Sequence, residues 1–482
     1  MLQRLPPEII LLIFHHLHHE FDRQDLIRLC HVSRVFRQLA QPILFSKFDV
    51  DIGPAELCAN NFVPLTLFTR TVLSRGDIRK ATREVVVRDL DDPGLSDDVR
   101  DTLSLPSDTL TMLVNEMERL GIDKNAFPRY STDIKSGEIN PVLVVLAANL
   151  ERLETLKISY VTDHMNSLLN MFDTGMAQPY FSNLTSIDIE LVRVNEDPAM
   201  DIIYTETILP LLALPRLQHF KANRCLGDDV YHPEEGITPN TMNFSSISLV
   251  DSCLDDMTLA EITMASKSLQ SFTYVVDVDI IENLEDSDPT NTEELMESLC
   301  CHEETLTEVH IEMKERSRAR GGSGERPTTF ESFAPLRNLH ELDIEQAAIT
   351  DAPELPESLQ VLRIRTCTCS VFDLVEFLVK ERRTRLHNLV EVKVAPRSMP
   401  CTAMLGMESS FLDVRVFTGK KSEVTEFKEG VIRMEAIVRE ADFKFYAECI
   451  SYNIMLRRMR EGLEGKEDAE RISGRYDTAK AE

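Results

Sequence analysis

One short apolar pattern returns nine times from about residue 150 onward, and it constrains the fold more than any other feature of the chain. Each copy has an apolar residue, two variable residues, an apolar residue, one variable residue and a last apolar residue, as in Leu153-x-x-Leu156-x-Ile158. The copies begin at Leu153, Leu184, Leu217, Phe244, Leu269, Leu306, Leu339, Leu359 and Leu389, at intervals of 20 to 37 residues. Such intervals are typical of repeat proteins, in which neighbouring units bury one another's apolar faces.

The last two apolar positions of each copy alternate with variable residues, which predicts a short strand with one buried face. Helical patterns lie between the copies, at 163–172, 205–214, 255–266, 293–302 and 371–383. Strand, helix and parallel strand in succession predict an α/β fold, a curved solenoid that resembles leucine-rich repeats. A conventional α/β domain remains the alternative, because it also alternates strands with helices.

The flanking segments have patterns of their own. Before the repeats we expect a helix over roughly 64–75, a turn at Gly76-Asp77, a strand at 85–87, a helix near 108–120 and a loop over 123–140. A charged, glycine-rich insertion is expected at 318–329. Apolar residues at steps of three and four predict one long helix over 421–460, which would cover the open end of the repeats. Its stripe is Val424, Phe427, Val431, Met434, Val438, Ala441 and Phe445.

Charge and cysteine usage narrow the function. The chain has 482 residues and a formal net charge of −29. Nucleic acid and anionic membrane surfaces are therefore not expected as partners, because both need clustered Lys and Arg. The 10 cysteines follow no regular spacing, and no apolar run reaches the ~20 residues that span a bilayer. We expect a soluble cytoplasmic or nuclear protein with reduced thiols.

Residues 1–45 form two predicted amphipathic helices, the first after Pro6 and Pro7 and the second from about Asp25. A segment this short cannot bury all its apolar side chains within itself. The segment is therefore expected to dock onto a partner.

The residues of this segment resemble the F-box motif. They include the opening Leu5-Pro6-x-Glu8-Ile9, the block Ile13-Phe14 with Leu17, and the later Val32-Ser33-Arg34 with Phe36. The resemblance implies docking onto a Skp-family adaptor, which joins F-box chains to a cullin and a RING subunit. The residues that it implies for adaptor binding are Leu5, Pro6, Ile9, Ile10, Ile13, Phe14, Leu17, Leu26, Leu29, Val32, Phe36 and Leu44.

Together these patterns predict five segments. They are an F-box helical module at 1–48, a linker region at 49–145, the repeat solenoid at 146–420, a capping helix at 421–460 and a disordered tail at 461–482.

Charged side chains alternate with the buried positions of three consecutive predicted strands, and they suggest a surface for a client protein. The alternating residues are Glu308, His310 and Glu312, then Glu341, Asp343 and Glu345, and then Arg363 and Arg365. Two interpretations are open. The carboxylates could attract a basic segment of a client, or they could pair internally with the two arginines.

We predict no catalytic residue, metal site or cofactor, because no phosphate-binding glycine loop, nucleophile elbow or zinc-protease helix occurs in the chain. The predicted function is that of a substrate receptor in an SCF-type ubiquitin ligase, which binds an unknown client on its repeats. The alternative is a repeat scaffold in an adaptor complex that transfers no ubiquitin.

Overall fold

The computed structural model describes 6–17, 23–52, 55–89, 107–120, 139–160, 180–191, 202–227, 237–276, 291–313, 329–368 and 370–396, and short pieces between 429 and 447. Its contacts divide the chain into Met1–Thr290, here unit 1, and Asn291–Glu482, here unit 2. The predicted helix at 163–172 and the insertion at 318–328 lie outside the described residues.

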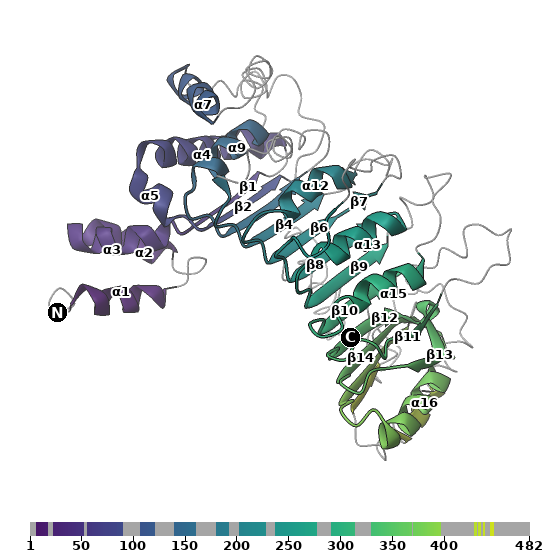
Figure 1. The fold of residues 1–482 in the computed structure, drawn as a ribbon. Coiled ribbons are helices and arrows are strands. Elements are labelled where there is room, and N and C mark those ends of the chain that lie inside the picture. Colours follow the sequence, from purple (N-terminus) through teal and green to yellow (C-terminus); the bar gives the residue numbers. More distant parts are fainter. Residues whose placement is uncertain are drawn as a thin grey trace. The chain divides into compact units, whose positions relative to one another are not determined.

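Unit 1 begins with a bundle of three helices, α1 (Pro7–His15), α2 (Arg23–Val32) and α3 (Arg34–Leu44) (Figure 1). The second predicted helix is therefore two helices. The break lies at Ser33, where the backbone is extended and the hydroxyl oxygen accepts a hydrogen bond from the Phe36 backbone N–H at 3.1 Å. A serine in this position satisfies a backbone donor at the start of the new helix.

A parallel sheet follows the bundle, and seven of its strands lie in unit 1. In spatial order they are β1 (Lys47–Ile52), β2 (Glu84–Asp89), β3 (Thr155–Tyr160), β4 (Ser186–Leu191), β6 (His219–Asn223), β8 (Ser246–Ser252) and β9 (Ser271–Val276). Two short strands, β5 (Ile203–Tyr204) and β7 (Cys225–Leu226), pair separately.

The other described helices of unit 1 are α4 (Ala55–Ser74), α5 (Gly76–Ala81), α7 (Ser107–Arg119), α9 (Ile139–Asn149), α12 (Thr205–Leu212) and α13 (Asp256–Ala265). Figure 1 shows α4, α9, α12 and α13 on one side of the strands. The apolar positions of the strands are buried toward the core, for example Leu156, Ile187 and Phe220.

Unit 2 contains the parallel strands β10 (Glu308–Glu312), β12 (Glu341–Glu345), β14 (Val361–Cys367), β15 (Glu391–Pro396) and β16 (Lys444–Ala447). A second pair is formed by β11 (Phe330–Ser332) and β13 (Ile349–Glu354), and the helices are α15 (Thr292–Cys300), α16 (Val371–Thr384) and the 3₁₀ turn η4 (Gln346–Ala348). All nine strands predicted from the apolar pattern are confirmed, and so is their parallel pairing within each unit.

Asparagine side chains connect successive copies of the pattern. Asn183, Asn243, Asn338 and Asn388 each stand directly before the first apolar residue of a copy. Each donates its side-chain N–H to a backbone carbonyl two residues before the first apolar residue of the preceding copy, at 2.8, 2.9, 2.5 and 2.9 Å. The same bond at equivalent positions shows that the copies share one local structure.

The prediction of a single helix over 421–460 is wrong at its end. Helical turns occur at 429–430, 432–434 and 437–438, but residues 444–447 form β16, which pairs with β15. Met434 and Val438 are buried as the apolar stripe predicted, whereas Phe445 belongs to the strand.

Two smaller expectations also fail. The predicted turn at Gly76-Asp77 is the first turn of α5. The end of the predicted loop is the start of α9 at Ile139.

Candidate docking surface

The first helix of the bundle has an inner and an outer face. Ile10 and Phe14 are turned inward and are 2% and 3% exposed. They pack in one cluster with Leu26 of α2 and Phe36 of α3, and the rings of Phe14 and Phe36 meet edge to face with centroids 5.6 Å apart. These four residues hold the three helices together.

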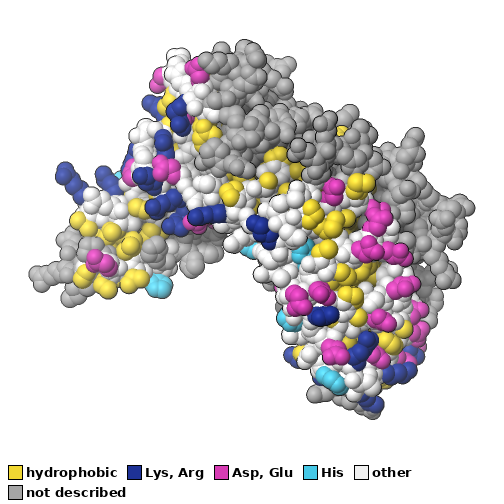
Figure 2. Space-filling view, viewed as in Figure 1, with side chains coloured by type: hydrophobic (Ala, Val, Ile, Leu, Met, Phe, Trp, Pro, Cys, Tyr) yellow, Lys and Arg dark blue, Asp and Glu magenta, His cyan; other side chains and the backbone are white. Residues whose placement is uncertain are grey.

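The outer face of α1 is apolar and uncovered. Ile9, Leu12 and Ile13 are 43%, 59% and 41% exposed, and their spacing of three and four residues places them on one helix face. Val32 at the end of α2 and Val35 in α3 are 57% and 49% exposed. Figure 2 shows hydrophobic side chains gathered on the bundle. Covering the exposed half of one such side chain contributes about 1 kcal/mol, so this surface can support binding to a partner.

The twelve residues that the F-box resemblance implied for adaptor binding differ in their exposure. Pro6, Ile9, Ile13 and Val32 are exposed, and Leu17, Leu29 and Leu44 are partly buried against the bundle core. Ile10, Phe14, Leu26 and Phe36 are a correction: their side chains form the bundle's own core and cannot contact a partner directly. Leu5 lies outside the described residues.

Sequence reasoning missed Leu12 and Val35, which are exposed. The signal was available for Leu12, because its spacing from Ile9 is that of one helix turn.

The bundle is tied to the rest of unit 1 by aromatic stacking. The ring of Phe68 in α4 lies 4.0 Å from that of Phe48 in β1, nearly parallel, and 6.2 Å from that of Phe45 at the end of α3. The Thr82 hydroxyl donates to the Phe45 carbonyl at 2.9 Å. The docking surface is therefore fixed to the first strands of the sheet.

The charged side chains predicted as a client surface lie in the expected register of unit 2. Asp343 of β12 lies between His310 of β10 and Arg363 of β14. The carboxylates, however, are paired. Arg365 contacts both oxygens of Asp343, at 2.7 and 2.6 Å, and Glu312 at 2.5 Å.

The remaining members extend the same network. Arg363 pairs with Glu341, and the His310 ring nitrogen lies 2.9 Å from Glu312. Burial would lower the pKa of Arg365, but the hydrogen bonds and charges of Asp343 and Glu312 outweigh it and raise that pKa.

These contacts bear on the two interpretations left open by the sequence. Asp343 and Glu345 are 3% and 1% exposed, so neither presents its charge to solvent. His310, Glu312, Glu341, Asp343, Arg363 and Arg365 therefore form a paired network, which favours the interpretation of internal pairing. Glu308 of the same predicted surface is exposed.

No described group of three His, Cys, Asp or Glu side chains is arranged to hold a metal ion. The six described cysteines are free thiols, and burial raises the pKa of Cys225 to about 12 and also raises that of Cys367. Such thiols are protonated at neutral pH, which makes them poor nucleophiles. Among the described helices, none has both the length and the apolarity to cross a bilayer.

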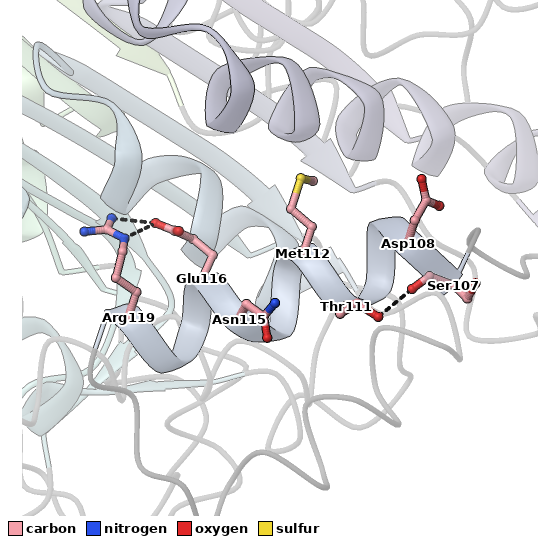
Figure 3. A pocket seen from close by; sticks show the side chains of 7 residues that line it. All are labelled: Ser107, Asp108, Thr111, Met112, Asn115, Glu116 and Arg119. Carbon is pink, nitrogen blue, oxygen red and sulfur yellow. Dashed lines mark hydrogen bonds and ion pairs between the residues drawn. The ribbon is translucent and has the colours of Figure 1, made fainter.

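An open hollow of about 660 Å³ lies along α7, and the described residues that line it come from that helix (Figure 3). Its charged side chains are engaged: Glu116 contacts Arg119 at 2.7 Å, and Asp108 lies 3.8 Å from Arg70. Among the described lining residues, no acid, base or nucleophile comes from another element.

Comparison with known protein families gives a match over the three-helix bundle. The family model described as F-box-like matches residues 2–51, and no curated protein matches the chain. F-box domains generally bind Skp-family adaptors. The matched range covers α1, α2, α3 and most of β1, which are the elements that form and support the exposed apolar surface. With this match and this packing, residues 2–51 of the chain form an F-box-like domain.

Proposed function

We propose that the chain is a substrate receptor of an SCF-type ubiquitin ligase. In this proposal the bundle docks onto a Skp-family adaptor, the adaptor joins it to a cullin and a RING subunit, and the repeat region holds a client protein. The observation that carries the proposal is the uncovered apolar face of Ile9, Leu12 and Ile13 on a bundle that matches the F-box-like family.

The repeat region is proposed to be a leucine-rich-repeat-like solenoid. The recurring asparagine bonds between successive copies support this interpretation, because a stack of similar units repeats its nearest-neighbour contacts. Alternate residues of the strands, such as Asp188 of β4 and Lys221 of β6, are polar and only partly buried, and a polar sheet face of this kind is suited to binding a partner.

The chain itself performs no chemical step in this proposal, and its contribution is to hold a client near a charged ubiquitin carrier. The compartment proposed is the cytoplasm, the nucleus or both. The network of Arg365, Asp343 and Glu312 is proposed to stabilise unit 2 rather than to bind the client.

The proposal is tested by co-purification with tagged full-length protein. Replacing Ile9, Leu12 and Ile13 together by alanine removes about 3 kcal/mol of apolar contact, so adaptor binding should weaken about a hundredfold. Leu67→Ala is the matched control, because Leu67 is 53% exposed in α4, outside the bundle. Adaptor capture that survives the triple substitution unchanged would remove the proposed surface.

The second candidate is a scaffold that binds the adaptor without ubiquitin transfer. Recovery of both adaptor and cullin supports the receptor function, and recovery of the adaptor without cullin supports the scaffold. Recovery of neither by the unmodified protein contradicts both.

A further inference from the structure

Positively charged side chains recur along the edge of unit 1 where its strands begin. Arg152 precedes β3, Arg216 precedes β6 and Lys267 precedes β9, and all three are exposed. On the strands between them, Asn183 precedes β4 and Asn243 precedes β8. Along the edge the order is therefore cation, amide, cation, amide, cation.

The two asparagines hold the cations without neutralising them. The Asn183 side-chain oxygen accepts a hydrogen bond from Arg216 Nη1 at 2.8 Å, and the Asn243 oxygen accepts one from Lys267 Nζ, also at 2.8 Å. The N–H groups of the same amides donate to the carbonyls of Glu151 and Pro215. An amide oxygen carries no net charge, so both cations are positioned and remain available to an anion.

Two carboxylates at this edge already face other cations. Glu154 contacts Arg83 at 2.6 Å, and Glu151 lies 4.0 Å from Lys80. Arg152 has no ion-pair partner among the residues that the structure describes. Within the part of unit 1 that the structure describes, the edge therefore keeps three exposed positive charges without an ion-pair partner.

Unit 2 has an asparagine at the equivalent position, but the cation beside it is paired with carboxylates. Asn338 donates to the Glu304 carbonyl, but the neighbouring Arg337 lies 3.7 Å from Glu303 and 3.8 Å from Glu304. The charged arrangement of unit 1 therefore does not follow from the asparagine bond itself.

The spacing of the cations indicates which kind of ligand would fit them. They stand on every second strand, and adjacent strands are about 4.8 Å apart, so successive cations are separated by roughly 10 Å. In the extended polyproline II conformation a polypeptide has three residues per turn and rises about 3.1 Å per residue, so carboxylates at every third residue lie on one side of it, about 9 Å apart.

We propose that Arg152, Arg216 and Lys267 form a binding edge for an extended acidic polypeptide with carboxylates at every third residue. Calling that polypeptide the client rests on the proposed receptor function, whereas the binding itself does not.

The test measures binding of two fluorescent peptides to the full-length protein by anisotropy. Both peptides contain the same number of Glu residues, in one case at every third position and in the other clustered at one end. The spaced peptide should bind at least threefold more tightly, and added salt should weaken binding, because ions screen exposed charges. Equal affinity for the two peptides would overturn the proposed spacing.

The triple variant Arg152→Gln, Arg216→Gln and Lys267→Gln should bind the spaced peptide at least tenfold more weakly. The matched control is Arg337→Gln, Lys380→Gln and Arg433→Gln, which removes the same charge from exposed positions of unit 2 and should stay within twofold of the unmodified protein. An equal loss of peptide affinity in the two variants would show that only net charge matters and would contradict a specific binding edge.

Two further measurements complete the test. An oligothymidylate that binds more tightly than the spaced peptide would contradict a polypeptide partner. Adaptor capture by the triple variant separates this proposal from the receptor function, because neutralising the edge should leave capture intact. If the unmodified protein binds the spaced peptide but captures no adaptor, the binding edge is supported and the receptor function is contradicted.

Discussion

Left-handed backbone recurs where strands of the sheet end, at residues that usually avoid it. Arg224, Asp251 and Thr366 have φ of 57°, 49° and 54°. Each directly precedes a buried Cys or Ser, namely Cys225, Ser252 and Cys367. The left-handed residue turns the chain so that the next side chain enters the core, and a β-branched residue such as Thr366 tolerates this conformation poorly.

Thr366→Gly should therefore stabilise the protein. Removing the left-handed penalty of about 1–2 kcal/mol outweighs the entropy cost of glycine, about 0.5–1 kcal/mol, so the free energy of unfolding should rise by about 0.5–1 kcal/mol. Urea unfolding of the full chain measures it. Thr241→Gly, at an exposed threonine without left-handed backbone, should lower stability; a Thr366 variant that behaves likewise would contradict the strain.

Glu116 gives a second effect at the residue scale. Partial burial raises its pKa, but hydrogen bonds from Arg119 and Asn149 and the charge of Arg119 outweigh burial and lower it. Its contribution to stability is therefore fully present above the unfolded pKa, about 4.3, and is lost as the pH falls through the lower folded pKa.

Glu116→Gln should accordingly destabilise the protein at pH 6, and the difference from the unmodified protein should shrink as the pH falls below about 4.3. Chemical unfolding at pH 6, 5, 4 and 3.5 follows that difference. The exposed Asp108→Asn serves as the control, with little change expected at any pH. A difference that grows on acidification would contradict the lowered pKa.

Among the elements, the asparagine bonds are the contacts that repeat. Asn338→Ala and Asn388→Ala each remove one bond to the preceding copy and should each cost about 1 kcal/mol of unfolding free energy. Thermal unfolding of each variant measures the cost. Asn115→Ala on the surface of α7 should change stability by less than half as much, and equal effects at the three positions would deny the inter-copy bond a special role.

The strands of the repeats were predictable because each buries alternating residues against the same core, so local pattern and tertiary structure agree. The bundle was predictable in kind from its motif. The sequence did not predict that Phe14 is buried in the bundle while the adjacent Ile13 is exposed. Both belong to one apolar block, and only the packing of the three helices determines which side chain faces the core.

The failures have physical causes too. In α9 the residues 142–148 are buried on all sides, so no apolar stripe marks the helix. Residues 444–447 fit a helical stripe, yet they pair with β15, about 50 residues earlier in the chain, and such a long-range contact overrides local preference. The cationic edge was missed because its members become neighbours only when the strands align.

At the scale of the whole molecule, Phe68 of α4 joins the bundle to the first strand of the sheet, because its ring packs against those of Phe45 and Phe48. Phe68→Ala removes the stacking with Phe48 and Phe45 and should cost about 3–5 kcal/mol, with faster amide hydrogen exchange over residues 34–48 than over unit 2. Leu67→Ala, its exposed neighbour, should leave the exchange pattern unchanged. Uniform acceleration throughout the chain would contradict a local joint.

The late position of β16 in the chain has a consequence for synthesis. β15 leaves the ribosome well before residues 444–447, so its outer edge waits with unpaired backbone groups until the last strand arrives. A nascent chain that stalls or terminates in this interval carries an open strand edge, which is a template for pairing with another polypeptide. Premature termination there therefore favours co-translational aggregation, whereas a chain that includes β16 covers β15 and leaves a strand of only 4 residues at the edge.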